Sequence, residues 1–131
     1  MKISPADKYF SRYIRIRDAD ENGKCHCITC GHESEPKYIQ CGHYGKRQHK
    51  GTRFSEKNCH AQCGACNKWE QGNDVIFRRK LVEMYGEEQV LLLESARYAT
   101  IKISKFELEQ IAKHYKQKST ELAKSKNIEL W

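Results

Sequence analysis

Four of the seven cysteines in this sequence occur as two CxxC pairs, an arrangement typical of a zinc site. In each pair a tight turn points both sulfurs inward, and four thiolates complete the tetrahedron that Zn²⁺ accepts. No coordination position stays open, so the predicted zinc is structural. Its predicted ligands are Cys27, Cys30, Cys63 and Cys66. The alternative is a set of unrelated redox or free thiols, and the remaining Cys25, Cys41 and Cys59 are expected to be ordinary small residues.

A histidine and an asparagine lie near the cysteine pairs and could bind a proton or a metal ion. His43 follows Gly42 between the pairs, and Asn67 directly follows the second pair. If the second pair leads into a helix, Asn67 lies in its first turn and can face a hairpin that carries His43. An imidazole can accept a proton from water, and an amide oxygen can bind a divalent cation. His60 is a further candidate ligand, although a structural role for it and for His43 stays open.

Basic residues near His43 favour a polyanionic partner. Lys46, Arg47, Lys50 and Arg53 follow His43 directly. They predict a clamp on phosphates beside the scissile bond, and the alternative is a solvated loop. Further DNA contacts are expected from Arg12 and Arg15, on the outward side of the first helix. The formal charge of +7 and a pI near 9.0 agree with this, but they do not separate nucleic acid from an acidic membrane surface.

Short helices and turns are expected to position these residues. A helix should begin at Pro5, with Ser4 as its N-cap and Asp7 near the positive end of its dipole. Residues 38–41 weakly favour a strand. The other expected helices cover residues 74–85, ended by Gly86, residues 87–94, and the segment after Ser104, which forms a capping box with Glu107.

The last expected helix carries an apolar stripe. Its members are Leu108, Ile111, Ala112, Tyr115 and Leu122. Such a stripe is covered by another helix. That helix is either the one over residues 74–85 or part of a second copy in a homodimer. We divide the chain into a core over residues 1–94 and a C-terminal helical extension over residues 95–131.

Length and composition indicate about one domain with a small core. The chain has 131 residues, of which 38% are hydrophobic and 31% charged, and its mean hydropathy is −0.87. No apolar run approaches the roughly 18 residues that span a membrane, and no leader is recognised. We therefore expect no membrane association and a cytoplasmic location, where reduced cysteines favour metal binding over disulfides.

The order CxxC, His43, CxxC and Asn67 resembles the zinc-bearing His-Me finger (HNH) nucleases. The resemblance implies an α+β fold, a small zinc-stabilised ββα-metal core that is treble-clef-like and has flanking helices. It also implies that His43 is the general base, that Asn58 orients its imidazole, and that Asn67 binds a catalytic Mg²⁺ or Mn²⁺. Many such proteins carry Asp before the His as a second metal ligand, where this sequence has Gly42.

A closer resemblance covers residues 4–94 and rests on an ordered series of short motifs. These are Phe10-Ser11-Arg12-Tyr13-Ile14-Arg15, Gly42-His43-Tyr44, Arg53-Phe54-Ser55-Glu56, Asn58-Cys59-His60-Ala61-Gln62-Cys63 and Cys66-Asn67. They are similar to motifs of the phage NinG (Rap) recombination proteins. The resemblance implies an endonuclease that hydrolyses phosphodiester bonds in branched DNA, such as Holliday junctions and D-loops, inside the bacterial host. The alternative is a non-catalytic Cys₄ zinc module that binds branched DNA and recruits recombination proteins.

Overall fold

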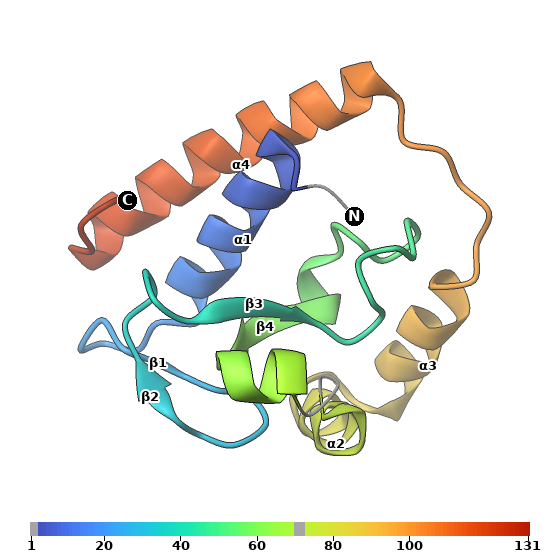
Figure 1. Cartoon of the computed structure of the whole chain (residues 1–131), viewed down its shortest axis with the longest axis horizontal. Coiled ribbons are helices and arrows are strands. Elements are labelled where there is room, and N and C mark those ends of the chain that lie inside the picture. Colours follow the sequence, from blue (N-terminus) through green and yellow to red (C-terminus); the bar gives the residue numbers. More distant parts are fainter. Residues whose placement is uncertain (1–2, 70–72) are drawn as a thin grey trace.

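The computed structural model describes residues 3–69 and 73–131 and has an α+β architecture (Figure 1). The helices are α1 (Pro5–Arg17), α2 (Asp74–Tyr85), α3 (Glu87–Ala96) and α4 (Lys105–Lys126), with a 3₁₀ turn η1 (Glu56–Asn58) and a π-helical turn η2 (Ala65–Trp69). Two antiparallel sheets of two strands each are formed by β1 (Cys25–His26), β2 (Glu33–Ser34), β3 (Gln40–His43) and β4 (Cys59–Gln62). No described helix is both long and apolar enough to cross a membrane.

The helix starts predicted at Ser4 and Ser104 are confirmed. The Ser4 hydroxyl accepts a hydrogen bond from the Asp7 backbone N–H at 3.2 Å, and the Asp7 carboxylate accepts one from the Ser4 N–H at 3.0 Å. Ser104 and Glu107 form the same reciprocal pair. Each pair satisfies two backbone donors that the first helical turn cannot satisfy. Local sequence therefore determines where α1 and α4 begin.

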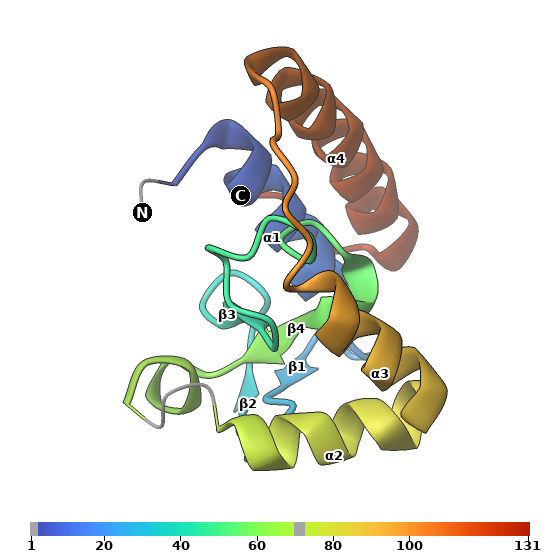
Figure 2. The ribbon, with the colours of Figure 1, turned by 90° about the vertical axis from the view of Figure 1, so that its right-hand side faces the viewer.

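Helices α1 and α4 pack side by side although they are far apart in the sequence (Figures 1 and 2). Phe10, Tyr13 and Ile14 of α1 form a buried cluster with Tyr115 of α4, and the rings of Phe10 and Tyr115 meet edge to face at 4.9 Å. The prediction that the α4 stripe packs on residues 74–85 is wrong, because α1 presents a larger aromatic face. The contact with α1 also covers the apolar stripe of α4, for which a second copy of the chain was the alternative partner.

Strands β3 and β4 lie between α1 and α2 in both views (Figures 1 and 2). His43 pairs with Cys59, and Gly42 pairs with His60. The strand predicted over residues 38–41 begins later, at Gln40. The reason is local, because residues 38 and 39 donate their N–H groups to the Glu35 carbonyl in a turn.

Helices α2 and α3 form the end of the molecule away from α4 (Figure 2). Gly86 ends α2 as predicted, with a φ of 91° and its N–H on the Val82 carbonyl at 2.8 Å. Helix α3 continues to Ala96, past its predicted end at residue 94. Both helices contribute to a second buried cluster, which holds Tyr44 and so fixes the start of the loop after β3; its buried members are Tyr44, Phe77, Leu81, Val90 and Leu93.

Candidate metal centre and active site

The four cysteines of the two CxxC pairs converge on one point. The first pair lies in the turn between β1 and β2, and the second pair joins β4 to η2. All four Sγ atoms lie within 4.8 Å of one another, and those of Cys30 and Cys63 are 3.6 Å apart. Tetrahedral Zn–S bonds of about 2.3 Å separate the sulfurs by about 3.8 Å. The cluster therefore fits a structural metal ion such as zinc.

Backbone hydrogen bonds hold the turns that carry the cysteines in a conformation suited to metal binding. Gly31, with a φ of 80°, donates its N–H to the Cys27 carbonyl at 2.8 Å, and Asn67 donates its N–H to the Cys63 carbonyl at 2.9 Å. Burial disfavours the Cys27 thiolate, but hydrogen bonds from the Thr29 hydroxyl and from backbone N–H groups outweigh it and lower the pKa of Cys27 to about 6. The thiolate is the form that binds a metal ion.

His43 ends β3 and lines a pocket of about 420 Å³ together with Lys46, Arg47 and Asn67. Its Nε2 lies 3.1 Å from the carbonyl oxygen of Arg53. Because a carbonyl oxygen only accepts, this contact places the proton on Nε2 and leaves the lone pair on Nδ1. Burial lowers the pKa of His43 below 6.5, against the opposing effect of the Arg53 carbonyl. The imidazole is therefore neutral at pH 7, as a general base must be.

Asn58 does not contact the His43 ring but holds the loop that follows it. The Asn58 Nδ2 donates to the carbonyls of Gly45 and Thr52 at 2.9 and 3.1 Å, and its Oδ1 accepts from the Gly45 N–H at 2.7 Å. The residue is 0% exposed. The structure thus contradicts the predicted contact, because backbone partners occupy both ends of the amide. Asn58 acts on His43 indirectly, since the loop it closes leads to Arg53.

Asn67 lies in η2 and faces the same pocket as His43. Its Nδ2 donates to Gln40 Oε1 at 2.9 Å, which fixes the orientation of the amide and leaves its oxygen as the atom that could bind a metal ion. Asp7 also lines the pocket, but its carboxylate is paired with Arg53. Among the pocket residues that the structure describes, Asn67 could thus hold a divalent ion through its amide oxygen. This donor set suits an ion such as Mg²⁺, which takes most of its ligands from phosphate and water.

The four basic residues after His43 have separate positions. Lys46 and Arg47 line the pocket, and Lys46 Nζ also lies 2.8 Å from Asp74 Oδ1. Lys50 is exposed on the loop. Arg53 is 7% exposed and binds the Asp7 carboxylate through both Nε and Nη2. The predicted phosphate contact of Arg53 is therefore wrong, because a buried carboxylate already holds its guanidinium.

The two arginines predicted to face outward from α1 are both engaged with the protein. Arg12 is buried between α1 and α4, where its Nε donates to Ser119 Oγ at 2.9 Å and its Nη1 to the Trp131 carbonyl at 3.0 Å. Its predicted outward position is wrong. Arg15 lines the pocket of His43, but its Nη1 donates to the carbonyls of Pro36 and Ile39 at 3.1 and 3.0 Å. Both side chains thus tie α1 to other segments.

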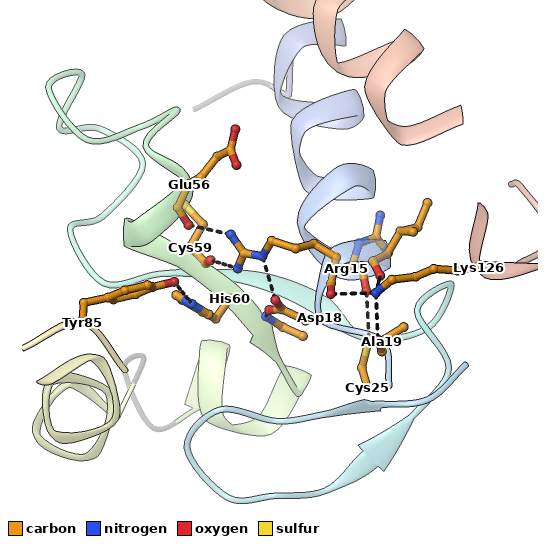
Figure 3. A network of polar contacts seen from close by, with 12 residues as sticks. Arg15, Asp18, Ala19, Cys25, Glu56, Cys59, His60, Tyr85 and Lys126 are labelled. Atoms are coloured by element: carbon orange, nitrogen blue, oxygen red, sulfur yellow. Dashed lines mark hydrogen bonds and ion pairs between the residues drawn. The ribbon is translucent and has the colours of Figure 1, made fainter. Parts of the chain in front are cut away.

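His60 lies on the opposite face of the β3 and β4 pair from His43, because successive residues of a strand alternate. Its Nε2 is 2.9 Å from the Tyr85 hydroxyl, as Figure 3 shows, and its ring meets Phe77 edge to face. Burial lowers the pKa of His60 to about 4. The structure does not bring His60 to Asn67, so the predicted ligand role has no geometric support.

The end of α1 is bonded directly to β4 (Figure 3). The Arg17 guanidinium donates to the carbonyls of Glu56 and Cys59, each at 2.7 Å, and to Asp18 Oδ1 at 2.8 Å. Asp18 Oδ2 in turn accepts from the Ala61 N–H at 2.8 Å. These bonds fix β4, the strand whose Cys59 pairs with His43, and so they help to hold His43 in position.

A side chain at Gly42, the residue before His43, would collide with a buried neighbour. A Cβ atom at Gly42 would lie 2.2 Å from Gln62 Oε1. Gln62 is fully buried, and its Nε2 donates to Thr29 Oγ1 at 3.2 Å beside the cysteine cluster. An aspartate at this position would therefore have to displace Gln62.

Comparison with known proteins identifies the family. The model of the bacteriophage lambda NinG protein family matches residues 3–126. The chain belongs to the NinG family. It is 32% identical over 126 residues to protein ninG of Escherichia phage lambda and of Salmonella phage P22, and 35% identical over 94 residues to that of Escherichia phage 933W. The first two alignments cover 95% of this chain and 59% of each relative, and the third covers 71% and 44%. No solved structure matches the chain.

Two residues that shape the site of this NinG-family protein were not predicted from its sequence. Gln40 orients Asn67 across 27 residues of chain, and Asp7 pairs with Arg53 across 46 residues. The only sequence signal for Asp7 was its place in the first turn of a helix. No spacing or motif marks either partnership, because the first arises where η2 meets β3 and the second where α1 meets the loop after β3.

Asp7→Asn is expected to destabilise the NinG-family protein by roughly 3 kcal/mol, because Arg53 would remain buried without its counter-charge. Burial raises the pKa of Asp7, but Arg53 and the hydrogen bonds from Ser4 together outweigh it and the net pKa is lowered, so the carboxylate is charged at pH 7. Urea denaturation in excess zinc measures the loss. Asp74→Asn removes the partner of exposed Lys46 and should cost at most about 1 kcal/mol. Equal losses in the two variants would contradict this account.

Proposed function

We propose that this protein is a metal-dependent, structure-selective endodeoxyribonuclease that cuts branched recombination intermediates, such as Holliday junctions and D-loops. One observation supports it above the others. His43 has its Nε2 on a backbone carbonyl and shares a pocket with Asn67, Lys46 and Arg47. A module that only binds DNA does not need a neutral, oriented imidazole among basic side chains. The proposal places the ββα-metal core in β3, β4 and η2.

In the proposed reaction, the Nδ1 lone pair of His43 accepts a proton from a water molecule. The resulting hydroxide attacks phosphorus in line with the 3′ oxygen, and the bond from phosphorus to that oxygen breaks. The leaving 3′ oxygen takes a proton from solvent and His43 returns its proton to solvent, so the products carry a 5′-phosphate and a 3′-hydroxyl. The Arg53 carbonyl holds the Nε2 proton in place throughout, so the imidazole does not need to change its tautomer before it acts.

Asn67 would hold the catalytic Mg²⁺ or Mn²⁺, with Gln40 fixing the amide. When bound, such an ion supplies charge stabilisation for the leaving oxygen and a non-bridging phosphate oxygen. Lys46 and Arg47 add positive charge on the same side of the pocket. They would draw the phosphate into the pocket and keep it beside His43.

The direct test is incubation with a four-way junction, a linear duplex and a single strand, each with Mg²⁺, with Mn²⁺ and with a chelator. We expect paired nicks in the junction that require the divalent ion. Tight junction binding without any cutting would instead support the non-catalytic Cys₄ zinc module.

Two opposed nicks need two active sites, so we also propose that two chains act on one junction. Light scattering of the junction complex measures that ratio, and a single chain per junction would contradict it.

Arg47→Ala is expected to weaken binding to every DNA form and to lower the slope of log K against log salt by about one, because one phosphate contact is lost. Filter binding over a range of salt concentrations measures the slope. Lys124→Ala removes an exposed charge of α4 outside the pocket and should leave the slope unchanged. A slope that is the same in both variants would make the loop after β3 an ordinary solvated loop.

A further inference from the structure

A second group of metal-binding side chains lies beside the proposed base. Cys41, His43 and Cys59 place two sulfurs and a ring nitrogen within 4.8 Å of one another. Cys41 and His43 are two residues apart on β3, and Cys59 is the partner of His43 on β4. All three therefore point to the same face of the paired strands. The group is separate from the Cys₄ cluster and shares no residue with it.

The surroundings of this group make it a built site with one open side. Cys59 is 0% exposed and packs against Phe10 in the cluster under α1. Cys41 and His43 are half-buried, and both line the pocket that also holds Asn67. The three donors thus stand on hydrogen-bonded strands, and the pocket gives access from one direction. Rigid placement of this kind lowers the entropy lost when a ligand binds.

We propose that Cys41, His43 and Cys59 form a second Zn²⁺ site, of lower affinity than the Cys₄ cluster, and that its occupancy switches the enzyme off. Two sulfurs and one imidazole are ligands that select Zn²⁺ over Mg²⁺. Three protein ligands leave the fourth tetrahedral position to water or to a phosphate oxygen from the pocket. The inhibitory role rests on the proposed nuclease function, whereas the binding of the ion does not.

The chemistry of the ligands explains both the switch and the lower affinity. A His43 nitrogen whose lone pair binds Zn²⁺ cannot accept a proton from water. Each cysteine gives up its thiol proton to solvent when its sulfur binds the ion. The second site offers two sulfurs and one imidazole, whereas the Cys₄ cluster supplies four sulfurs to one ion, so the second site binds Zn²⁺ less tightly.

The experiment measures zinc stoichiometry directly. Protein that holds one tightly bound zinc is titrated with Zn²⁺ against a chromophoric chelator of known affinity. We expect one further ion per chain in the natural protein, and a loss of at least about 10- to 100-fold in the affinity for that ion in Cys41→Ser. Cys25→Ser, which changes a cysteine outside both groups, should bind the second ion normally. A natural protein that binds no second ion, or an unchanged second affinity in Cys41→Ser, would overturn the proposal.

A second arm separates this inference from the nuclease proposal. Cleavage of a four-way junction in Mg²⁺ is measured with increasing Zn²⁺, and each variant is compared with its own rate before zinc is added. We expect Zn²⁺ to inhibit the natural protein and Cys25→Ser at concentrations that leave Cys41→Ser active. Equal inhibition of all three would overturn the switch. If nothing cleaves, the nuclease proposal fails, while the stoichiometry still decides whether the second site exists.

Discussion

Cys63→Ser is expected to release the bound zinc and to unfold the centre of the chain. Structural zinc contributes about 10 to 16 kcal/mol in small modules, which exceeds the stability of many whole domains. The hairpin of β1 and β2 should depend on this ion, because both strands are two residues long and are joined through the cysteine turn. Metal analysis and near-ultraviolet circular dichroism should therefore show the loss of zinc and of fixed packing together.

Cys25→Ser is the matched control for this experiment. Cys25 is as deeply buried as any cysteine here and lies next to the cluster in sequence, but its Sγ donates to the Arg15 carbonyl at 3.0 Å. A serine hydroxyl can keep that bond, so one zinc and a native spectrum are expected. Zinc retained by Cys63→Ser, or protein purified without chelator that contains no zinc, would refute the proposed centre.

His43→Ala is expected to slow cleavage by about 10²- to 10⁴-fold while the DNA affinity and the zinc of the Cys₄ cluster stay near those of the natural protein. The reason is that a general base stabilises the transition state and does not bind phosphate in the ground state. Single-turnover cleavage of a four-way junction measures the rate, and filter binding without added Mg²⁺ or Mn²⁺ measures the affinity. His49→Ala changes a histidine that contacts Tyr98 outside the pocket and should cleave normally.

The pH profile gives this prediction a second readout. Burial lowers the pKa of His43 below 6.5, so the imidazole is neutral through the physiological range. Activity should be full above this lowered pKa and should fall as the pH drops through it, because the protonated ring has no lone pair. The residual activity of His43→Ala should lack this acidic limb. Wild-type speed in His43→Ala, or an unchanged limb, would show that another group is the base.

The elements that could be predicted from the sequence are those set by neighbouring residues. The helix starts at Ser4 and Ser104 and the end of α2 at Gly86 follow from contacts within four residues. The convergence of the four CxxC cysteines was also predicted, because two such pairs together supply the four thiolates that one zinc ion binds. These features need no knowledge of how distant segments pack.

The features that could not be predicted depend on distant partners. The sequence suggests that Arg12 and Arg53 are surface cations. In the structure each is buried against a distant residue: Arg12 contacts Ser119, 107 residues away, and Arg53 contacts Asp7, 46 residues away. A charge pattern along one helix cannot reveal which segment will cover it. Asn58 was assigned to the imidazole from the resemblance to HNH nucleases, and its partners in the loop become visible only when the loop closes.

The packing of α1 on α4 also sets the order in which a newly made chain can fold. The Cys₄ centre has all its ligands once Cys66 has been made, so it can close before α4 exists. Arg12 and Ser119 are 107 residues apart, and ribosomes add roughly 5 to 20 residues per second. The aromatic face of α1 therefore stays without its partner helix for about 5 to 20 s during synthesis. During that interval Phe10 and Tyr13 are available to chaperones and to other nascent chains.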